Sequence, residues 1–144
     1  MSPQNGLQHY QVNEISTSSQ SQLILMMYDG ALQAVDRAMV CMTKKDVAGQ
    51  SKHILKAQDI INELSLALDM KQGGPVAQTL EQLYQFVLNQ LIQANITSDP
   101  VYLEAIPKVL TPLREAWARI GESPVAESPV PEDYPDARRF AARC

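Results

Sequence analysis

The chain has 144 residues, a formal net charge of −4 and 45% hydrophobic residues, enough for one domain with its own core. The acidic balance argues against nucleic-acid binding, which needs clustered lysine and arginine. The longest apolar run, 23–28, is far shorter than the roughly 20 residues of a membrane span. No secretory signal is visible at the start of the sequence, so we expect a cytosolic protein without membrane insertion.

The hydrophobic period predicts two helices in the first half of the chain. The first is expected from about 20 to 44, with Ser19 and Gln22 as a capping box. The second is expected from an N-cap at Asp46 to about residue 69. Residues 1–18 show no sustained period and form a separate N-terminal segment.

Two further helices are predicted in the second half. The third helix begins after the break at Gly73-Gly74, with Pro75 at its first position. The fourth begins at Pro100 and keeps one apolar stripe to residue 120, although two prolines lie inside it. We expect a kink there, with Thr111 able to cap a second start. Residues 121–144 are rich in proline and charge, as in a flexible tail.

These elements predict an all-α fold, an antiparallel up-down four-helix bundle. No strand pattern or hairpin turn occurs in the sequence, and the short connections favour antiparallel neighbours. The expected organisation is an N-terminal segment over 1–18, a four-helix bundle over 19–120 and a proline-rich tail over 121–144.

No pattern for catalysis or metal binding is found. The two histidines, His9 and His53, do not follow a glutamate by three residues, as a di-metal bundle requires. Neither a nucleophile–histidine signature nor a phosphate-binding loop is present. Two cysteines, Cys41 and Cys144, make no disulfide framework. We therefore expect no catalytic residue, no metal and no cofactor, and a protein that is not an enzyme.

One short motif gives an alternative function. His53 and the following Ile54-Leu55-Lys56-Ala57 resemble the phosphorylated helix of histidine-phosphotransfer bundles. Those domains carry glycine after the lysine, which leaves room beside the phosphohistidine. Here the position is Ala57, on the predicted core stripe, so a half-exposed helical histidine is the simpler interpretation.

The first helix shows two apolar stripes where a surface helix needs one. The second stripe, together with apolar residues outside the stripes of the next two helices, exceeds what an isolated bundle normally exposes. A partner protein, a homodimer contact or a loosely packed core would each account for this surplus. Methionine-rich surfaces suit a partner segment laid into a groove. The residues expected to line this groove are Ile24, Tyr28, Leu32, Val35, Met39, Ile60, Phe86 and Ile92.

The chain also resembles a known family, the flagellar secretion chaperone FliS. The matching residues occur in the family's order over about 8–120, and the ordered set is specific although no single element is. They are Tyr10-Gln11, Asn13, Ser19, residues 23–31, Lys56-Ala57-Gln58, Ile60-Ile61, Glu63-Leu64, Leu68-Asp69, Gly73-Gly74, Leu83-Tyr84, Leu91, Ala94-Asn95 and residues 113–117.

The resemblance implies a bacterial cytosolic chaperone. It would bind the C-terminal segment of flagellin, prevent premature polymerisation and deliver flagellin to the flagellar type III export gate. The resemblance also implies that the N-terminal segment, with Tyr10, Val12 and Ile15, is a cap that the client displaces. If the second stripe of the first helix is the groove, Leu32→Glu or Val35→Glu should abolish binding and leave the fold intact.

Overall fold

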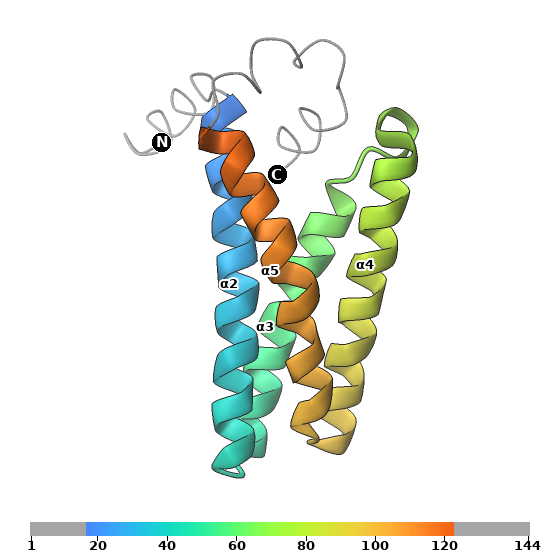
Figure 1. Cartoon of the computed structure of the whole chain (residues 1–144). Coiled ribbons are helices and arrows are strands. Elements are labelled where there is room, and N and C mark those ends of the chain that lie inside the picture. The colour runs from blue at the N-terminus through green and yellow to red at the C-terminus, as the bar shows by residue number, and fades with distance from the viewer. Residues whose placement is uncertain (1–16, 123–144) are drawn as a thin grey trace, which may run out of the picture.

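The structure, a computed structural model, describes residues 17–122, which form four helices. Along the chain these are α2 (Thr17–Thr43), α3 (Val47–Leu66), α4 (Met70–Thr97) and α5 (Pro100–Glu122). Successive helices run in opposite directions, and α2 and α4 each pack on both α3 and α5 (Figure 1). No strand occurs within these residues. The predicted all-α antiparallel four-helix bundle is confirmed.

Three aspartates begin the helices after the first. The side chains of Asp46 and Asp69 each accept a hydrogen bond, 2.9 Å long, from the backbone N–H three residues later. Asp99 accepts one of 3.0 Å from the backbone N–H two residues later, with Pro100 opening the helix between them. Because these bonds satisfy N–H groups that lack a partner within the helix, each short connection ends at a defined residue.

Three helix details differ from the sequence prediction. α2 begins at Thr17, so Ser19 lies inside the helix rather than at its N-cap. α4 begins one turn early, leaves helical geometry at Gly74 (φ 54°, ψ −134°) and continues from Pro75. Glycine is the residue that tolerates these backbone angles. α5 runs as one helix through both of its internal prolines, and the second start predicted at Thr111 is absent.

The core is filled by large side chains from all four helices. At its centre the hydroxyls of Tyr28 on α2 and Tyr84 on α4 share a hydrogen bond of 2.6 Å. Both tyrosines are fully buried, so this bond joins the two diagonally opposed helices through the middle of the bundle. The largest aliphatic side chains around them are Ile24, Ile54, Ile61, Leu64, Leu91, Leu103, Ile106 and Leu110.

A polar joint fixes α3 to α4 at the end of the bundle where α3 starts. The side chain of Gln50, only 1% exposed, donates to Ser98 Oγ (3.1 Å) and to Asn95 Oδ1 (3.4 Å). Ser51 Oγ donates to the same Asn95 oxygen at 2.9 Å. A buried amide without partners would be costly, so these bonds favour one register between the two helices.

Candidate partner-binding surface

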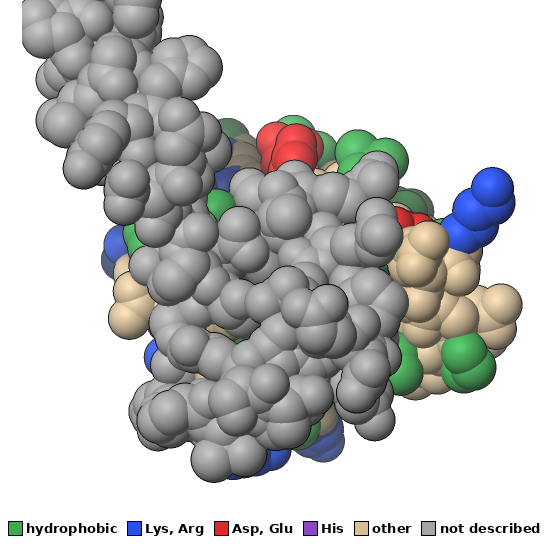
Figure 2. All heavy atoms as spheres, turned by 90° about the horizontal axis from the view of Figure 1, so that it is seen from above, with side chains coloured by type: hydrophobic (Ala, Val, Ile, Leu, Met, Phe, Trp, Pro, Cys, Tyr) green, Lys and Arg blue, Asp and Glu red, His purple; other side chains and the backbone are tan. Residues whose placement is uncertain are grey.

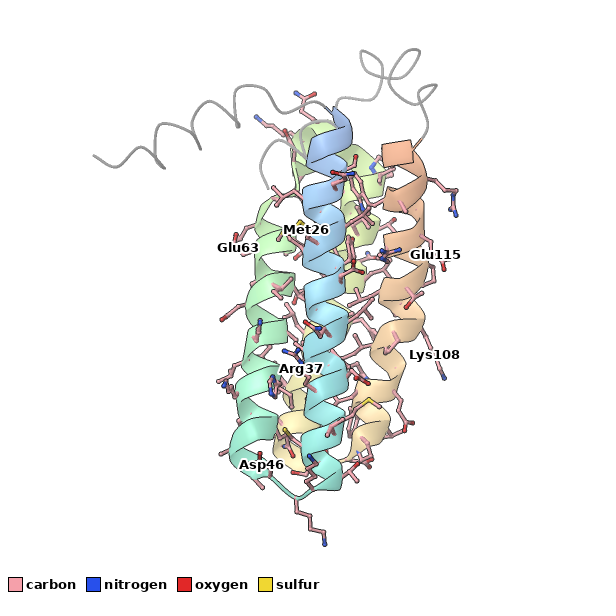
Figure 3. All side chains as sticks on the ribbon, turned by 90° about the vertical axis from the view of Figure 1, so that its left-hand side faces the viewer. Met26, Arg37, Asp46, Glu63, Lys108 and Glu115 are labelled. Carbon is pink, nitrogen blue, oxygen red and sulfur yellow. The ribbon has the colours of Figure 1, made fainter. Side chains whose placement is uncertain are left out.

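α2 carries two apolar stripes because it packs on two neighbouring helices. Figure 3 shows it between α3 and α5. On one flank, a Cβ at Gly30 would lie 3.3 Å from Cδ1 of Ile60 on α3. On the other flank, Asp29 pairs with Arg114 of α5, with Oδ1 and Nε 2.6 Å apart. The second stripe is therefore largely covered within the same chain, and the expectation that it forms a vacant face is wrong.

The burial of individual side chains shows which of the expected groove residues are covered. Ile24 and Tyr28 are 0% exposed and Val35 is 1% exposed. These three side chains belong to the core, so they do not line an open groove in this structure. The remaining members of the expected groove on α2 and α3 are half-buried and packed against the core: Leu32, Met39 and Ile60.

The last two expected residues, both on α4, are exposed but lie on different sides of the helix. Phe86 is 42% exposed and Ile92 is 45% exposed, and their spacing of six residues separates them by about 120° around the helix. Gln90, one turn after Phe86, donates to a backbone carbonyl of α5 at 3.3 Å. Glu81, three turns before Ile92, accepts a hydrogen bond from a serine of α3. Phe86 thus faces the α5 side and Ile92 the α3 side.

An apolar strip runs along the outer seam between α4 and α5. On α4 its residues follow at intervals of seven and three, and on α5 at intervals of seven, which keeps each set on one side of its helix. Val76 and Phe86 are 57% and 42% exposed, and the other members are half-buried. We call this surface the α4–α5 strip: Val76, Leu83, Phe86, Tyr102, Val109 and Ala116.

An open pocket of about 200 Å³ lies at the end of the α4–α5 strip where α4 begins and α5 ends. Val76 and Ala116 belong both to the strip and to the pocket wall. Gly73 and Ala77 leave space that longer side chains on α4 would fill. We call this space the end pocket; its other apolar walls come from Leu68, Leu80, Leu113, Trp117 and Ile120, with Asp69 as the polar residue.

Sequence reasoning missed the end pocket. Its larger apolar residues on the third and fourth helices belong to the apolar stripes of those helices, and a stripe alone does not show that the neighbouring helix leaves the space opposite unfilled. The available signal was the pairing of small residues, Ala77 on one helix and Ala116 on the other, next to the Gly73-Gly74 break. Using that signal requires the register between α4 and α5, which the sequence pattern does not supply.

Side chains of both charges reach the surface at the end of the bundle seen in Figure 2. Where the end-on view of Figure 2 leaves the bundle visible, basic and acidic side chains are scattered and hydrophobic side chains reach the surface between them. The Asp29 carboxylate raises the pKa of Arg114, mainly through their hydrogen bond and also through its charge. This pair lies on the α2 side of α5 and is not part of the α4–α5 strip. The contact area of the strip is apolar, as is typical of partner-binding surfaces.

Metal-binding and membrane-spanning features were sought over the same part of the chain. Within residues 17–122 no three histidine, cysteine, aspartate or glutamate side chains are grouped so as to hold a metal ion. None of the four described helices combines the length and the hydrophobicity of a membrane span.

Two features of the sequence prediction concern residues other than those of the α4–α5 strip. Tyr10, Val12 and Ile15 fall outside the described residues, so their role as a cap stays a prediction. His53 is half-buried on α3, and Ala57, one turn later, is 0% exposed. A phosphohistidine needs free space at that neighbouring position, so nothing in this geometry favours phosphotransfer.

The sequence is similar to those of several known bacterial proteins. The flagellar secretion chaperone FliS of Salmonella typhimurium is 36% identical over 107 residues, which cover 74% of this chain and 79% of the relative. The Escherichia coli protein of the same name is 31% identical over 118 residues, 81% of this chain and 87% of the relative. The Bacillus subtilis protein is 29% identical over 123 residues, 85% and 91% respectively.

The shared region includes every described helix. The family model described as flagellar protein FliS matches residues 3–124, and the structure places α2 to α5 within 17–122. The chain belongs to the FliS family of flagellar secretion chaperones.

Proposed function

We propose that this protein binds the C-terminal segment of flagellin along the α4–α5 strip in the bacterial cytosol. Binding there keeps flagellin from polymerising early and allows its delivery to the flagellar export gate. The observation that carries the proposal is the strip itself, an apolar seam with an open pocket at one end, in a chain of the flagellar secretion chaperone family. The relatives are named flagellar secretion chaperones. Flagellin as the client and the export gate as its destination are our own inference.

The dimensions of the α4–α5 strip suit a short amphipathic helix. Tyr102 and Ala116 are 14 residues apart on α5, a distance of about 21 Å along the helix axis, or four turns of a client helix. A helix laid into such a groove uses apolar side chains at intervals of three and four residues. Because the strip is long and shallow, it can hold a segment that folds on binding and can release it later.

The chain's own N-terminal segment is the proposed cover of this surface before the client arrives. α2 begins at Thr17, at the same end of the bundle as the end pocket (Figure 1). Tyr10, Val12 and Ile15 precede that residue by only a few positions. An apolar cover that the client displaces would keep the strip from other partners, since uncovered apolar patches promote association.

The test is a calorimetric titration of the full-length protein with a peptide of the flagellin C-terminal segment. Phe86→Glu places a carboxylate in the middle of the strip and should weaken binding at least tenfold. Val40→Glu is the matched control, because Val40 is 47% exposed on α2, diagonally across the bundle from α4. Both variants should keep their helical circular dichroism, since exposed substitutions change stability by only about 0.5 kcal/mol.

The outcomes separate the competing explanations. Equal affinities of the Phe86→Glu and Val40→Glu variants for the peptide would refute the α4–α5 strip as the docking surface. No peptide binding by the unmodified protein, together with a mass that doubles with concentration, would instead favour a homodimer contact. Ile92→Glu tests whether the client continues around α4 to its α3 side, where we propose a second and weaker contact.

A further inference from the structure

The end pocket has room for one ring-bearing side chain. Its volume of about 200 Å³ exceeds the roughly 150 Å³ of an apolar cavity that accommodates benzene. Its walls are apolar apart from Asp69 at one edge. A phenyl ring suits such a wall better than a phenol, because a buried tyrosine hydroxyl usually needs a hydrogen-bond partner.

The chain that follows α5 starts beside this pocket. Ile120 forms part of the pocket wall, α5 ends at Glu122, and 22 further residues follow in the sequence. Phe140 lies 18 residues beyond Glu122 and is the phenylalanine of that stretch; its other aromatic residue is Tyr134. A random coil of 18 residues has an average end-to-end distance of roughly 25 Å, so the length of chain between Glu122 and Phe140 is sufficient to reach the pocket.

We propose that Phe140 of the protein's own C-terminal tail occupies the end pocket. A tethered side chain is present at an effective concentration in the millimolar range, so even a weak contact is populated. The tail then competes with the client for the end of the α4–α5 strip at which the end pocket lies. This consequence rests on the proposed function. This internal competitor lowers apparent client affinity and is displaced when a longer segment fills the whole strip.

Trp117 provides a direct reporter of the contact. It is the single tryptophan of the sequence and lines the end pocket. We compare acrylamide quenching of Trp117 fluorescence in the full-length protein and in its Phe140→Ser and Tyr134→Ser variants. The Phe140→Ser variant should show at least twofold stronger quenching with unchanged circular dichroism, and the Tyr134→Ser variant should match the unmodified protein.

Three results of the quenching experiment would overturn the proposal. The first is unchanged quenching in the Phe140→Ser variant, and the second is an equal increase in the Tyr134→Ser control. The third is an increase in a Tyr10→Ser variant without one in Phe140→Ser, which assigns the pocket to the N-terminal segment. Quenching that depends on protein concentration would assign it to the tail of a second copy and would equally refute an intramolecular contact.

A spin label places the tail independently. Cys144 lies four residues after Phe140, and a Cys41→Ser substitution leaves it as the one labelling site. A nitroxide on Cys144 should broaden the NMR methyl signals of Ala77, Leu113 and Ala116, and Phe140→Ser should restore them. Broadening confined to another part of the bundle would refute the contact.

The flagellin peptide then tests the competition. Removing the internal competitor should make the Phe140→Ser variant bind the peptide about three- to tenfold more tightly than the unmodified protein. Equal affinities would refute the competition. If no variant binds the peptide, the proposed function fails, whereas the quenching and broadening experiments, which contain no peptide, still decide whether the tail occupies the pocket.

Discussion

The Tyr28–Tyr84 hydrogen bond allows a quantitative test of how the bundle is held together. The two hydroxyls lie 2.6 Å apart, both residues are fully buried, and they come from the diagonally opposed helices α2 and α4. Tyr28→Phe, Tyr84→Phe and the double variant remove the hydroxyls and leave the rings in place. The three variants form a double-mutant cycle, which cancels whatever else each hydroxyl contacts and isolates their mutual bond.

The expected coupling free energy is about 0.5–1.5 kcal/mol, the usual net contribution of a buried neutral hydrogen bond. Each single variant should be destabilised by about 1–2 kcal/mol, and the double variant by less than the sum of the two. In a bundle of this size a change of 1 kcal/mol lowers the melting temperature by about 4–8 °C, which is readily measured.

The assay is urea unfolding followed by circular dichroism and by Trp117 fluorescence, with coincident curves as evidence of a two-state transition. Tyr102→Phe is the control, because Tyr102 is half-buried on α5 and its substitution should change stability by no more than about 0.5 kcal/mol. A coupling free energy below about 0.3 kcal/mol would show that the bond does not stabilise the bundle. Client affinity should stay unchanged in the Tyr28→Phe, Tyr84→Phe and double variants, since neither Tyr28 nor Tyr84 belongs to the α4–α5 strip.

Three further predictions follow from burial and backbone geometry. Val35→Glu should destabilise the fold by about 3–5 kcal/mol, because it buries an unpaired charge. An unchanged midpoint of urea unfolding would contradict this prediction. Gln50→Ala removes the centre of the polar joint and should cost about 1–3 kcal/mol, against a negligible change for the exposed Gln33→Ala. Gly74→Ala forces a side chain into a backbone conformation open to glycine, which should cost about 1–3 kcal/mol of melting stability; an unchanged melting temperature would refute the strain.

The helices were predictable from the sequence because their signals are local. The N-caps at Asp46 and Asp99 and the break at Gly74 each depend on a few neighbouring residues and on backbone angles that few residue types adopt. Exceptions are the cap expected at Ser19, which lies inside α2, and the second start that interior prolines suggested at Thr111 of α5. The apolar stripe of α5 packs against the core on either side of the prolines, and that packing keeps one helix.

The binding surface was less predictable, because it depends on which helix covers which stripe. Periodicity grouped Ile24, Tyr28 and Val35 correctly on one side of α2, yet it could not reveal that α2 lies between two neighbours that bury this side. Phe86 was correctly expected to be exposed. The end pocket arises from small side chains that happen to be opposed across α4 and α5, a property of register rather than of either sequence segment alone.

The two ends of the α4–α5 seam are built differently. At one end α4 and α5 are connected by the short Ser98–Asp99 link, and Ser98 also belongs to the polar joint between α3 and α4; at the other end the end pocket lies between α4 and α5, next to Gly74. We expect such a seam to separate more easily at the end with the pocket than at the linked end, because fewer contacts hold the helices together there. If the α4–α5 strip binds the proposed client, we expect the client to enter and leave by this local separation, without unfolding of the bundle.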